Sequence, residues 1–154
     1  MSDRLPQYFP LGEGRSYQLG RIMLTFKTSA TDTGGAYTLC EALEPPGSGA
    51  GLHRHASYDE THIICGGRYE ARLGNKPLQL SAGDLFFVPR GAPHSIKCLG
   101  PETGRELMIS SPGGVFDAFI DEVVSSMTAS GSPIGAPAVD FRAIAGKYGI
   151  EFLS

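Results

Sequence analysis

Long apolar runs are absent from this 154-residue sequence. No stretch approaches the roughly 20 apolar residues that a membrane-spanning helix needs, and the N-terminal MSDRLPQYFPLG has no apolar core of signal-peptide length. Runs of lysine or arginine are absent as well, and the net charge is only -3. These absences argue against nucleic acid and membranes as partners. We therefore expect a soluble, cytoplasmic protein.

Cysteine is also scarce. The three cysteines, Cys40, Cys65 and Cys98, form no CxxC pair, and their odd number argues against a disulfide framework. Each lies among apolar or β-branched residues, which favours buried free thiols. A reactive or disulfide-bonded cysteine is the alternative.

Glycine and proline, in contrast, are abundant, with 21 and 11 residues. The glycine content is about twice the average for globular proteins, which indicates many turns. The length suits one domain with a sizeable core, and we expect residues 1–154 to form a single domain. Many turns within one domain are typical of an all-β fold built from short strands.

Most of the sequence reads as short strands separated by turns. A pattern of eight or more such strands predicts a sandwich or a small barrel. Gly74–Asn75 is a two-residue hairpin signal. We expect the last two strands to pair with each other around the turn GPETG. The predicted strands are residues 16–29, 36–43, 60–73 with a bend at Gly66–Gly67, 76–81, 84–89, 94–100 and 105–111.

Helical spacing replaces the alternating pattern after residue 114. Apolar residues recur every three to four positions over 115–127, which predicts an amphipathic helix that packs on the barrel. Residues 128–137 are expected to form a loop. Asp140 is a candidate N-cap for a second, short helix that ends at Gly149.

Three of the four histidines lie within ten positions of the chain, around Glu60. His53 and His55 alternate along a strand and project to the same side, roughly 6.6 Å apart. Glu60 and His62 share a face of the next strand, and the remaining histidine, His94, follows a turn rich in glycine and proline. Chance clustering on an exposed loop, or hydrogen-bonded polar residues in a barrel, are the alternatives to a metal site.

The spacing of these residues resembles the two motifs of the cupin superfamily. Residues 47–67 read G(X)5HXH(X)4E(X)6G, and residues 83–94 read G(X)5PXG(X)2H, with 15 residues between them. The helix that follows these motifs resembles the C-terminal helix of small, single-domain, quercetinase-like cupins. The resemblance implies a double-stranded β-helix, or jelly-roll, barrel over about 16–111, with a helical tail over about 115–149. It also implies one divalent metal ion per chain, with four ligands: His53, His55, Glu60 and His94.

Two positions depart from the family pattern or are ambiguous. Cys98 stands where the family usually carries an asparagine, which leaves the four ligands unaffected. His62 stands where relatives often carry an aromatic or apolar side chain. It is a candidate hydrogen-bond donor near the metal, a candidate proton shuttle, or a surface residue.

Three imidazoles and one carboxylate suit Fe, Ni, Mn, Cu or Zn. We expect an apolar pocket that binds a small organic molecule. The resemblance implies a dioxygenase in which Glu60 takes the substrate proton, with His62 as a second catalytic candidate. A non-redox isomerase, cyclase or lyase, or a non-catalytic binding module, are the alternatives. We also expect a homodimer, formed through the strand around Ile22–Phe26. The expected pocket walls are strands that contain Ile64, Phe86, Val88, Ile96, Met108 and Ile109.

Overall fold

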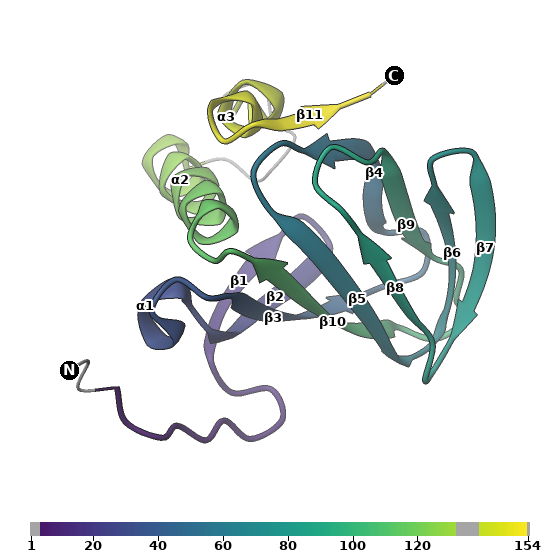
Figure 1. The fold of residues 1–154 in the computed structure, drawn as a ribbon, viewed down its shortest axis with the longest axis horizontal. Helices are drawn as coiled ribbons and strands as arrows, with labels where there is room; N and C mark the ends of the chain where they lie inside the picture. Colours follow the sequence, from purple (N-terminus) through teal and green to yellow (C-terminus); the bar gives the residue numbers. More distant parts are fainter. Residues whose placement is uncertain (1–3, 132–138, 154) are drawn as a thin grey trace.

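Two antiparallel sheets face each other in the computed structural model, which describes residues 4–131 and 139–153 (Figure 1). The strands are β1 (Arg15–Leu19), β2 (Ile22–Thr28), β3 (Thr38–Glu44), β4 (Gly49–His55), β5 (Asp59–Gly66), β6 (Arg68–Leu73), β7 (Lys76–Ser81), β8 (Leu85–Val88), β9 (His94–Cys98), β10 (Gly104–Ser111) and β11 (Ile150–Phe152). The helices are α1 (Ala30–Thr33), α2 (Val115–Ser130) and α3 (Phe141–Lys147).

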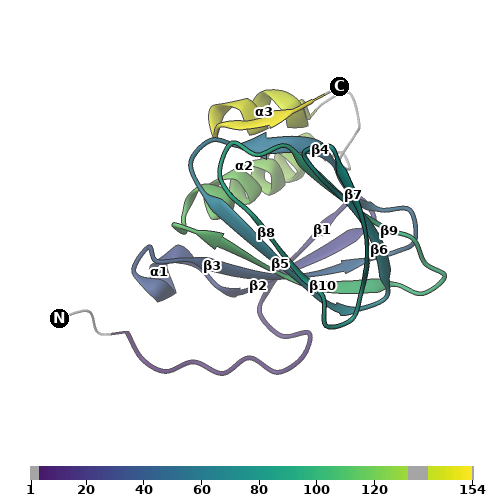
Figure 2. The ribbon, with the colours of Figure 1, turned by 45° about the vertical axis from the view of Figure 1, so that its right-hand side comes forward.

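The six-stranded sheet has the order β1-β2-β3-β10-β5-β8, and the five-stranded sheet has the order β11-β4-β9-β6-β7. Figure 2 shows the two sheets closing into a barrel, with α3 above its upper end and α2 alongside it. The predicted all-β jelly roll with C-terminal helices is confirmed. No helix in the described part of the chain is long and apolar enough to cross a membrane.

The predicted strand over residues 16–29 is wrong, because this segment is a hairpin of two strands. β1 and β2 pair antiparallel from Arg15–Phe26 to Leu19–Ile22. Gly20 adopts a left-handed φ of 60° at the turn, a conformation that glycine reaches without strain. The apolar residues that face the core change from odd positions, Tyr17 and Leu19, to even positions from Ile22 onward, and this break in the alternation was the sign of the reversal.

The expected pairing of the last two barrel strands is also wrong. β9 pairs with β4 and β6 in one sheet, whereas β10 pairs with β3 and β5 in the other. The GPETG turn therefore carries the chain from one sheet to the other. Each strand buries one face in the shared interior, so alternation alone could not identify its partner.

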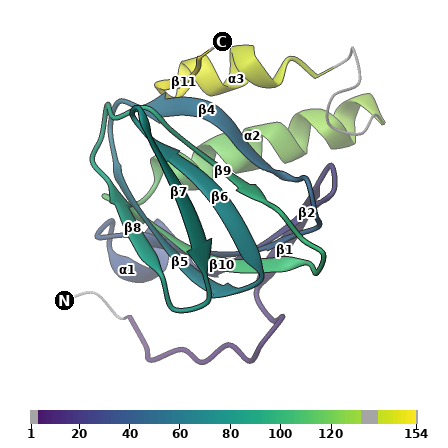
Figure 3. The same cartoon turned by 90° about the vertical axis from the view of Figure 1, so that its right-hand side faces the viewer.

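The predicted hairpin at Gly74–Asn75 and the helix that packs on the barrel are both confirmed. Phe119, Ile120 and Val123 of α2 join the core that contains β2 and β3 residues. Figure 3 shows α2 alongside the barrel, between α3 and the strands β1 and β2. The predicted loop over 128–137 is wrong at its start, since α2 continues to Ser130, and residues 132–138 lie outside the described part. Asp140 caps α3 as predicted, because its side chain accepts from the Ala143 N–H.

Candidate metal centre

The strand β4 supplies two of the four predicted ligands. Because side chains alternate between the two faces of β4, His53 and His55 point into the barrel and Arg54 between them is exposed. β4 lies between β11 and β9, and His53 stands opposite Phe152 on one side and His94 on the other. The register of this sheet therefore brings the third histidine beside the first.

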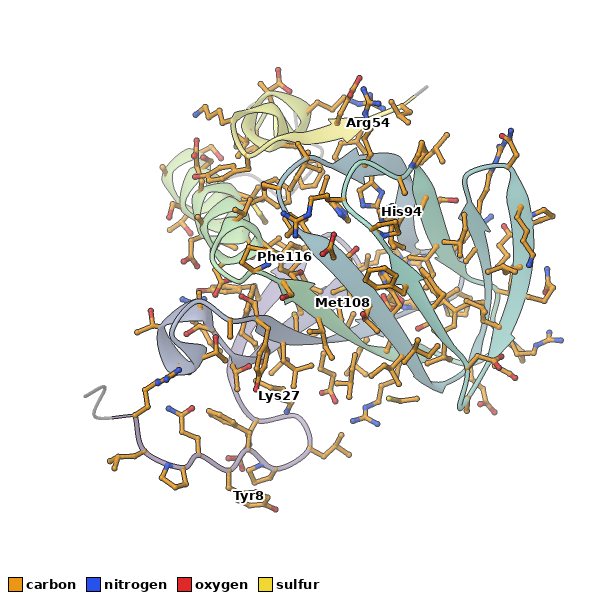
Figure 4. All side chains as sticks on the ribbon, in the orientation of Figure 1. Tyr8, Lys27, Arg54, His94, Met108 and Phe116 are labelled. Carbon is orange, nitrogen blue, oxygen red and sulfur yellow. The ribbon has the colours of Figure 1, made fainter. Side chains whose placement is uncertain are left out.

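Glu60 comes from β5, the next strand along the chain, whereas His94 begins β9, which pairs with β4 in the sheet. Glu60 faces inward from β5 and is 4% exposed. The turn before His94 is tied to β4 by the Gly91 N–H, which donates to the His55 carbonyl oxygen over 2.6 Å. Gly91 has a φ of 81°, a left-handed conformation that explains glycine at this motif position. Figure 4 shows His94 inside the barrel, between the two sheets.

Backbone carbonyls fix the tautomers of two of the rings. Nδ1 of His53 lies 2.7 Å from the Gly51 oxygen, and Nδ1 of His94 lies 3.1 Å from the Ala92 oxygen. A carbonyl oxygen can only accept, so in neutral rings both Nδ1 atoms carry the proton and both Nε2 atoms carry a lone pair. This is the arrangement by which proteins orient metal-binding histidines.

Aromatic rings hold the histidines from the side. Phe152 stacks on His53 with ring centroids 5.5 Å apart, and Tyr58 stacks on His55 at 4.3 Å with a 14° interplanar angle. These contacts bury both imidazoles, and burial is the main cause that lowers the pKa of each to about 4. Both rings are therefore neutral at pH 7 and keep a free nitrogen lone pair.

One nitrogen from each of His53, His55 and His94 and a Glu60 carboxylate oxygen lie within 4.8 Å of one another. The His53 and His55 Nε2 atoms are 3.1 Å apart, and the Glu60 Oε2 atom lies 3.3 Å from Nε2 of His55 and of His94. Ligands about 2.1 Å from one ion stand roughly 3–4.3 Å apart, so this donor set fits a divalent metal. The four predicted residues lie together and could hold a metal ion.

His62 is buried, so the surface alternative for this residue is wrong. Its Nε2 lies 3.0 Å from Glu60 Oε2, and its Nδ1 lies 2.9 Å from Glu106 Oε2. Burial alone would lower the pKa of His62, but the charges of Glu106 and Glu60 raise it to about 10. Burial alone would likewise raise the pKa of Glu60, yet His62 holds it well below its usual value. The ring is thus an imidazolium between two carboxylates.

A cavity of about 330 Å³ opens onto this cluster. Its walls are mainly apolar and include Met108 and three aromatic side chains from the helices and β11, namely Phe116, Phe119 and Phe152. Figure 4 shows Met108 on β10 and Phe116 at the start of α2. Of the six residues expected on pocket strands, only Ile96 and Met108 reach the cavity. Ile64, Phe86 and Val88 instead fill a separate core between the sheets, and Ile109 lies on the opposite face of β10.

Sequence reasoning missed several residues of this site. Tyr58, in the turn before Glu60, was not among the candidate residues, yet it is 1% exposed and covers His55. Glu106 and Glu44 are buried acids that line the cavity, on strands whose inward positions otherwise read as apolar. Acidic residues at the buried positions of an alternating strand were the signal that could have identified them.

All three cysteines are free. Cys40 and Cys98 are buried as predicted, whereas Cys65 is partly exposed. Burial raises the pKa of the Cys40 thiol, which makes it a poor nucleophile. Cys98 packs in the second core, where its Sγ lies 3.6 Å from the Glu102 carbonyl oxygen.

Comparison with known proteins agrees with this arrangement. A family model described as a cupin domain matches residues 41–110, which include all four candidate ligands. The chain carries a cupin domain. This cupin resembles the solved structure of KdgF from Halomonas sp. with a TM-score of 0.63 at 19% identity, over 70% of this chain and 96% of that one. At that identity the likeness concerns the fold.

Two curated proteins are similar in sequence to the cupin. An uncharacterized protein of Methanocaldococcus jannaschii is 33% identical over 75 residues, which are 49% of this chain and 60% of that protein. The oxalate-binding protein of Thermotoga maritima is 38% identical over 56 residues, which are 36% of this chain and 46% of that protein. The matches thus span about half the length of these relatives.

Proposed function

We propose that this cupin is a metal-dependent enzyme for a small, enolisable or aromatic organic molecule, and that it acts as a quercetinase-like dioxygenase. The observation that carries the proposal is the apolar cavity that ends on four converging donor atoms. Three imidazoles and one carboxylate leave an octahedral metal ion two coordination positions for substrate. A bound metal ion would supply Lewis-acid activation of a substrate oxygen.

The residues around the cluster have separate tasks in this proposal. His53, His55 and His94 hold the metal, and the apolar walls exclude water from the substrate. Glu60 has a carboxylate held ionised by His62, so it is the group that accepts a substrate proton. His62 stands 3.0 Å from Glu60 with a charged ring, so it can donate a proton back through that contact.

A non-redox reaction at the same site is the second candidate. The hydrogen-bonded series Glu60–His62–Glu106 suits proton transfer in an isomerase, cyclase or lyase, and it needs no oxygen. A non-catalytic binding module is the third candidate, and the name of the oxalate-binding relative favours it. Only the consumption of oxygen separates the first candidate from the second.

Metal analysis is the first test. The purified protein should contain about one transition metal ion per chain, and His53→Ala or His94→Ala should lose it. His62→Phe is the matched control, because it changes a buried histidine of the same cavity and leaves all four donors in place. A wild-type protein that binds no transition metal would overturn the proposal.

Oxygen-electrode assays with flavonols, catechols and β-diketones are the second test. Oxygen uptake that depends on substrate and metal supports the dioxygenase. Equal turnover without oxygen would replace it with the non-redox enzyme. A compound that raises the melting temperature without being turned over would favour the binding module.

We further propose that the protein is a homodimer, but not through β2. Both edges of β2 are already hydrogen-bonded, to β1 and to β3, so the expected pairing of Ile22–Phe26 across a two-fold axis is wrong. The outer face of the six-stranded sheet supports association better. Leu85 and Phe87 of its edge strand β8 are more than half exposed there. Large exposed apolar side chains grouped on one face are typical of an interface.

A further inference from the structure

Two buried carboxyl groups lie along the cavity beyond His62, on the side away from the four candidate metal ligands. Glu44 and Glu106 face inward from the paired strands β3 and β10, where Glu106 stands opposite Ala42 and Glu44 stands opposite Gly104. Two positions along a strand correspond to about 6.6 Å, so Glu44 lies one step further than Glu106 along the six-stranded sheet. The cavity is therefore apolar along its sides and acidic at this inner end.

The two acids differ in their partners. Glu106 is bonded to His62, whereas Oε2 of Glu44 has no hydrogen-bond partner, although the side chain is only 3% exposed. The Tyr69 hydroxyl lies near this carboxyl, but it too has no partner with hydrogen-bond geometry. A buried polar atom without a partner has a free-energy cost in the folded protein. A ligand atom in the cavity could remove this cost.

The protonation of Glu44 decides which ligand group fits. Burial, and then the charge of Glu106, raise the pKa of Glu44 to about 8, so the group is mostly a neutral carboxylic acid at pH 7. A neutral carboxyl both donates and accepts hydrogen bonds, as a hydroxyl group does. A ligand carboxylate at the same place would face Glu106 with no Lys or Arg among the described residues that line the cavity.

We infer that Glu44 recognises a neutral hydroxyl group of the substrate, at the end remote from the oxygens that bind the metal. The inference rests on the proposed function, because it takes the other end of the substrate to lie at the metal. The substrate class is then an uncharged chelating enol or diketone with an apolar body and a distal hydroxyl. The acidic inner end selects against dicarboxylates that would extend into it.

Four β-diketones test this assignment. They are 1-phenylbutane-1,3-dione, its derivatives with a meta or para hydroxyl on the phenyl ring, and the derivative with a para carboxylate. Their binding to the zinc-loaded protein is measured by titration calorimetry, since zinc has no redox chemistry. We expect one of the hydroxyl compounds to bind about three- to tenfold more tightly than the parent, and the carboxylate to bind more weakly than the parent.

Substitutions of Glu44 test whether this side chain causes the preference for the hydroxyl compound. Glu44→Leu should reduce the affinity ratio between the hydroxyl compound and the parent to about one. Glu44→Gln, which keeps the side-chain volume and a hydrogen-bonding group, should retain part of the ratio. The control Glu70→Gln changes an exposed acid on β6 and should leave the ratio at its wild-type value.

The outcomes separate this inference from the proposed function. If zinc and the parent diketone bind but neither hydroxyl compound is preferred, the role of Glu44 is refuted and the metal site stands. An unchanged ratio in both Glu44 variants refutes it as well. If zinc is not retained, or no diketone binds to the zinc-loaded protein, the proposed function fails and the inference fails with it.

Discussion

A single carboxylate oxygen, Oε2 of Glu60, lies within 3.3 Å of three imidazole nitrogens. Nε2 of His62 lies nearest to it, at 3.0 Å, and the charged ring donates a proton there, because its other nitrogen is held by Glu106. In its neutral form, the His94 ring turns a lone pair toward the same oxygen, since its Nδ1 proton points at a carbonyl. Two lone pairs at this distance repel each other unless a cation lies between them, so the cluster itself favours a bound metal ion.

His62→Phe tests the part of this arrangement that lies outside the metal ligands. The phenyl ring can keep the stacking on Phe86, which now has ring centroids 4.4 Å apart, but it cannot donate to Glu60. We expect an unchanged metal content and a fall in turnover of about 100-fold, because general acid–base groups contribute at least that much. Metal analysis and steady-state kinetics measure the two quantities. Full activity in this variant would remove the proposed role of His62.

Glu44 should make the stability of the protein depend on pH. Its pKa is about 8 in the folded chain and near the ordinary 4.5 in the unfolded chain. Between these values the unfolded chain has released a proton that the folded chain retains, so the free energy of unfolding falls as the pH rises. The contribution of Glu44 to the free energy of unfolding is fully present below pH 4.5 and is lost by pH 8.

Glu44→Gln cannot ionise, so its free energy of unfolding should fall less steeply than that of the wild type between pH 5 and pH 8. The difference in the free energy of unfolding between this variant and the wild type should grow by at most about 1.4 kcal/mol for each pH unit. Urea unfolding at four pH values measures it, with the exposed Glu70→Gln as the control. Parallel curves for Glu44→Gln and the wild type would contradict the raised pKa.

The sequence predicted the ligands of this site better than their surroundings. The ligands follow a spacing that two motifs define, and metal binding tolerates few other side chains at such positions. Tyr58 and Glu106 follow no such rule. Their roles arise from strand pairing that brings Glu106 beside β5 and from a turn that folds Tyr58 over His55. Such contacts between distant segments are set by the tertiary structure and not by local pattern.

Element types were predictable because each has its own periodicity. Inward alternation marked β5, and apolar spacing of three to four residues marked α2. The pairing partners of the strands were not predictable, because β9 and β10 bury equivalent faces and each could pair in either sheet. The three-residue strand β11 was missed because it is too short for any pattern, and its register on β4 is what places Phe152 against His53.

α2 should be essential for stability because it closes the core of the six-stranded sheet. Ile120 is 2% exposed and packs in the same cluster as Leu24 and Phe26 of β2. Ile120→Ala should lower the free energy of unfolding by about 2–5 kcal/mol, which combines lost burial and a cavity. Ser125→Ala, on the exposed side of the same helix, should change it by less than about 0.5 kcal/mol. Urea unfolding compares the two, and equal effects would mean that α2 does not pack as described.

The outer face of the six-stranded sheet is covered unevenly. The N-terminal segment over residues 4–13 crosses its β2–β3 side, where Lys27 Nζ donates to the Pro10 and Glu13 carbonyl oxygens (Figure 4). The β5–β8 side is left bare, and there the register aligns Leu85 with Ile63 and Leu107 in one apolar row. An alternating sheet normally turns polar residues to water, so this row indicates a partner surface.

A second copy of the chain fits that surface because the same molecule carries a matching set of unburied side chains. Tyr8 is 85% exposed on the N-terminal segment and points away from the barrel, and Leu5 and Leu11 are also exposed (Figure 4). A two-fold axis would place the segment of each copy on the bare row of the other, so both apolar sets are buried in one closed interface. The interface would need no change in the barrel or in the metal centre.

Phe87→Asp tests this association, because it puts a charge in the middle of the bare side. Sedimentation velocity at about 50 µM should give the wild type twice the chain mass of 16.3 kDa and the variant a single chain mass. Leu99→Asp is the control, since Leu99 is an exposed apolar residue outside the six-stranded sheet and its change should leave the dimer intact. Tyr8→Asp should weaken the dimer from the opposite side of the same contact. A monomeric wild type, or a Phe87→Asp protein that stays dimeric, would show that the bare row is not where two copies meet.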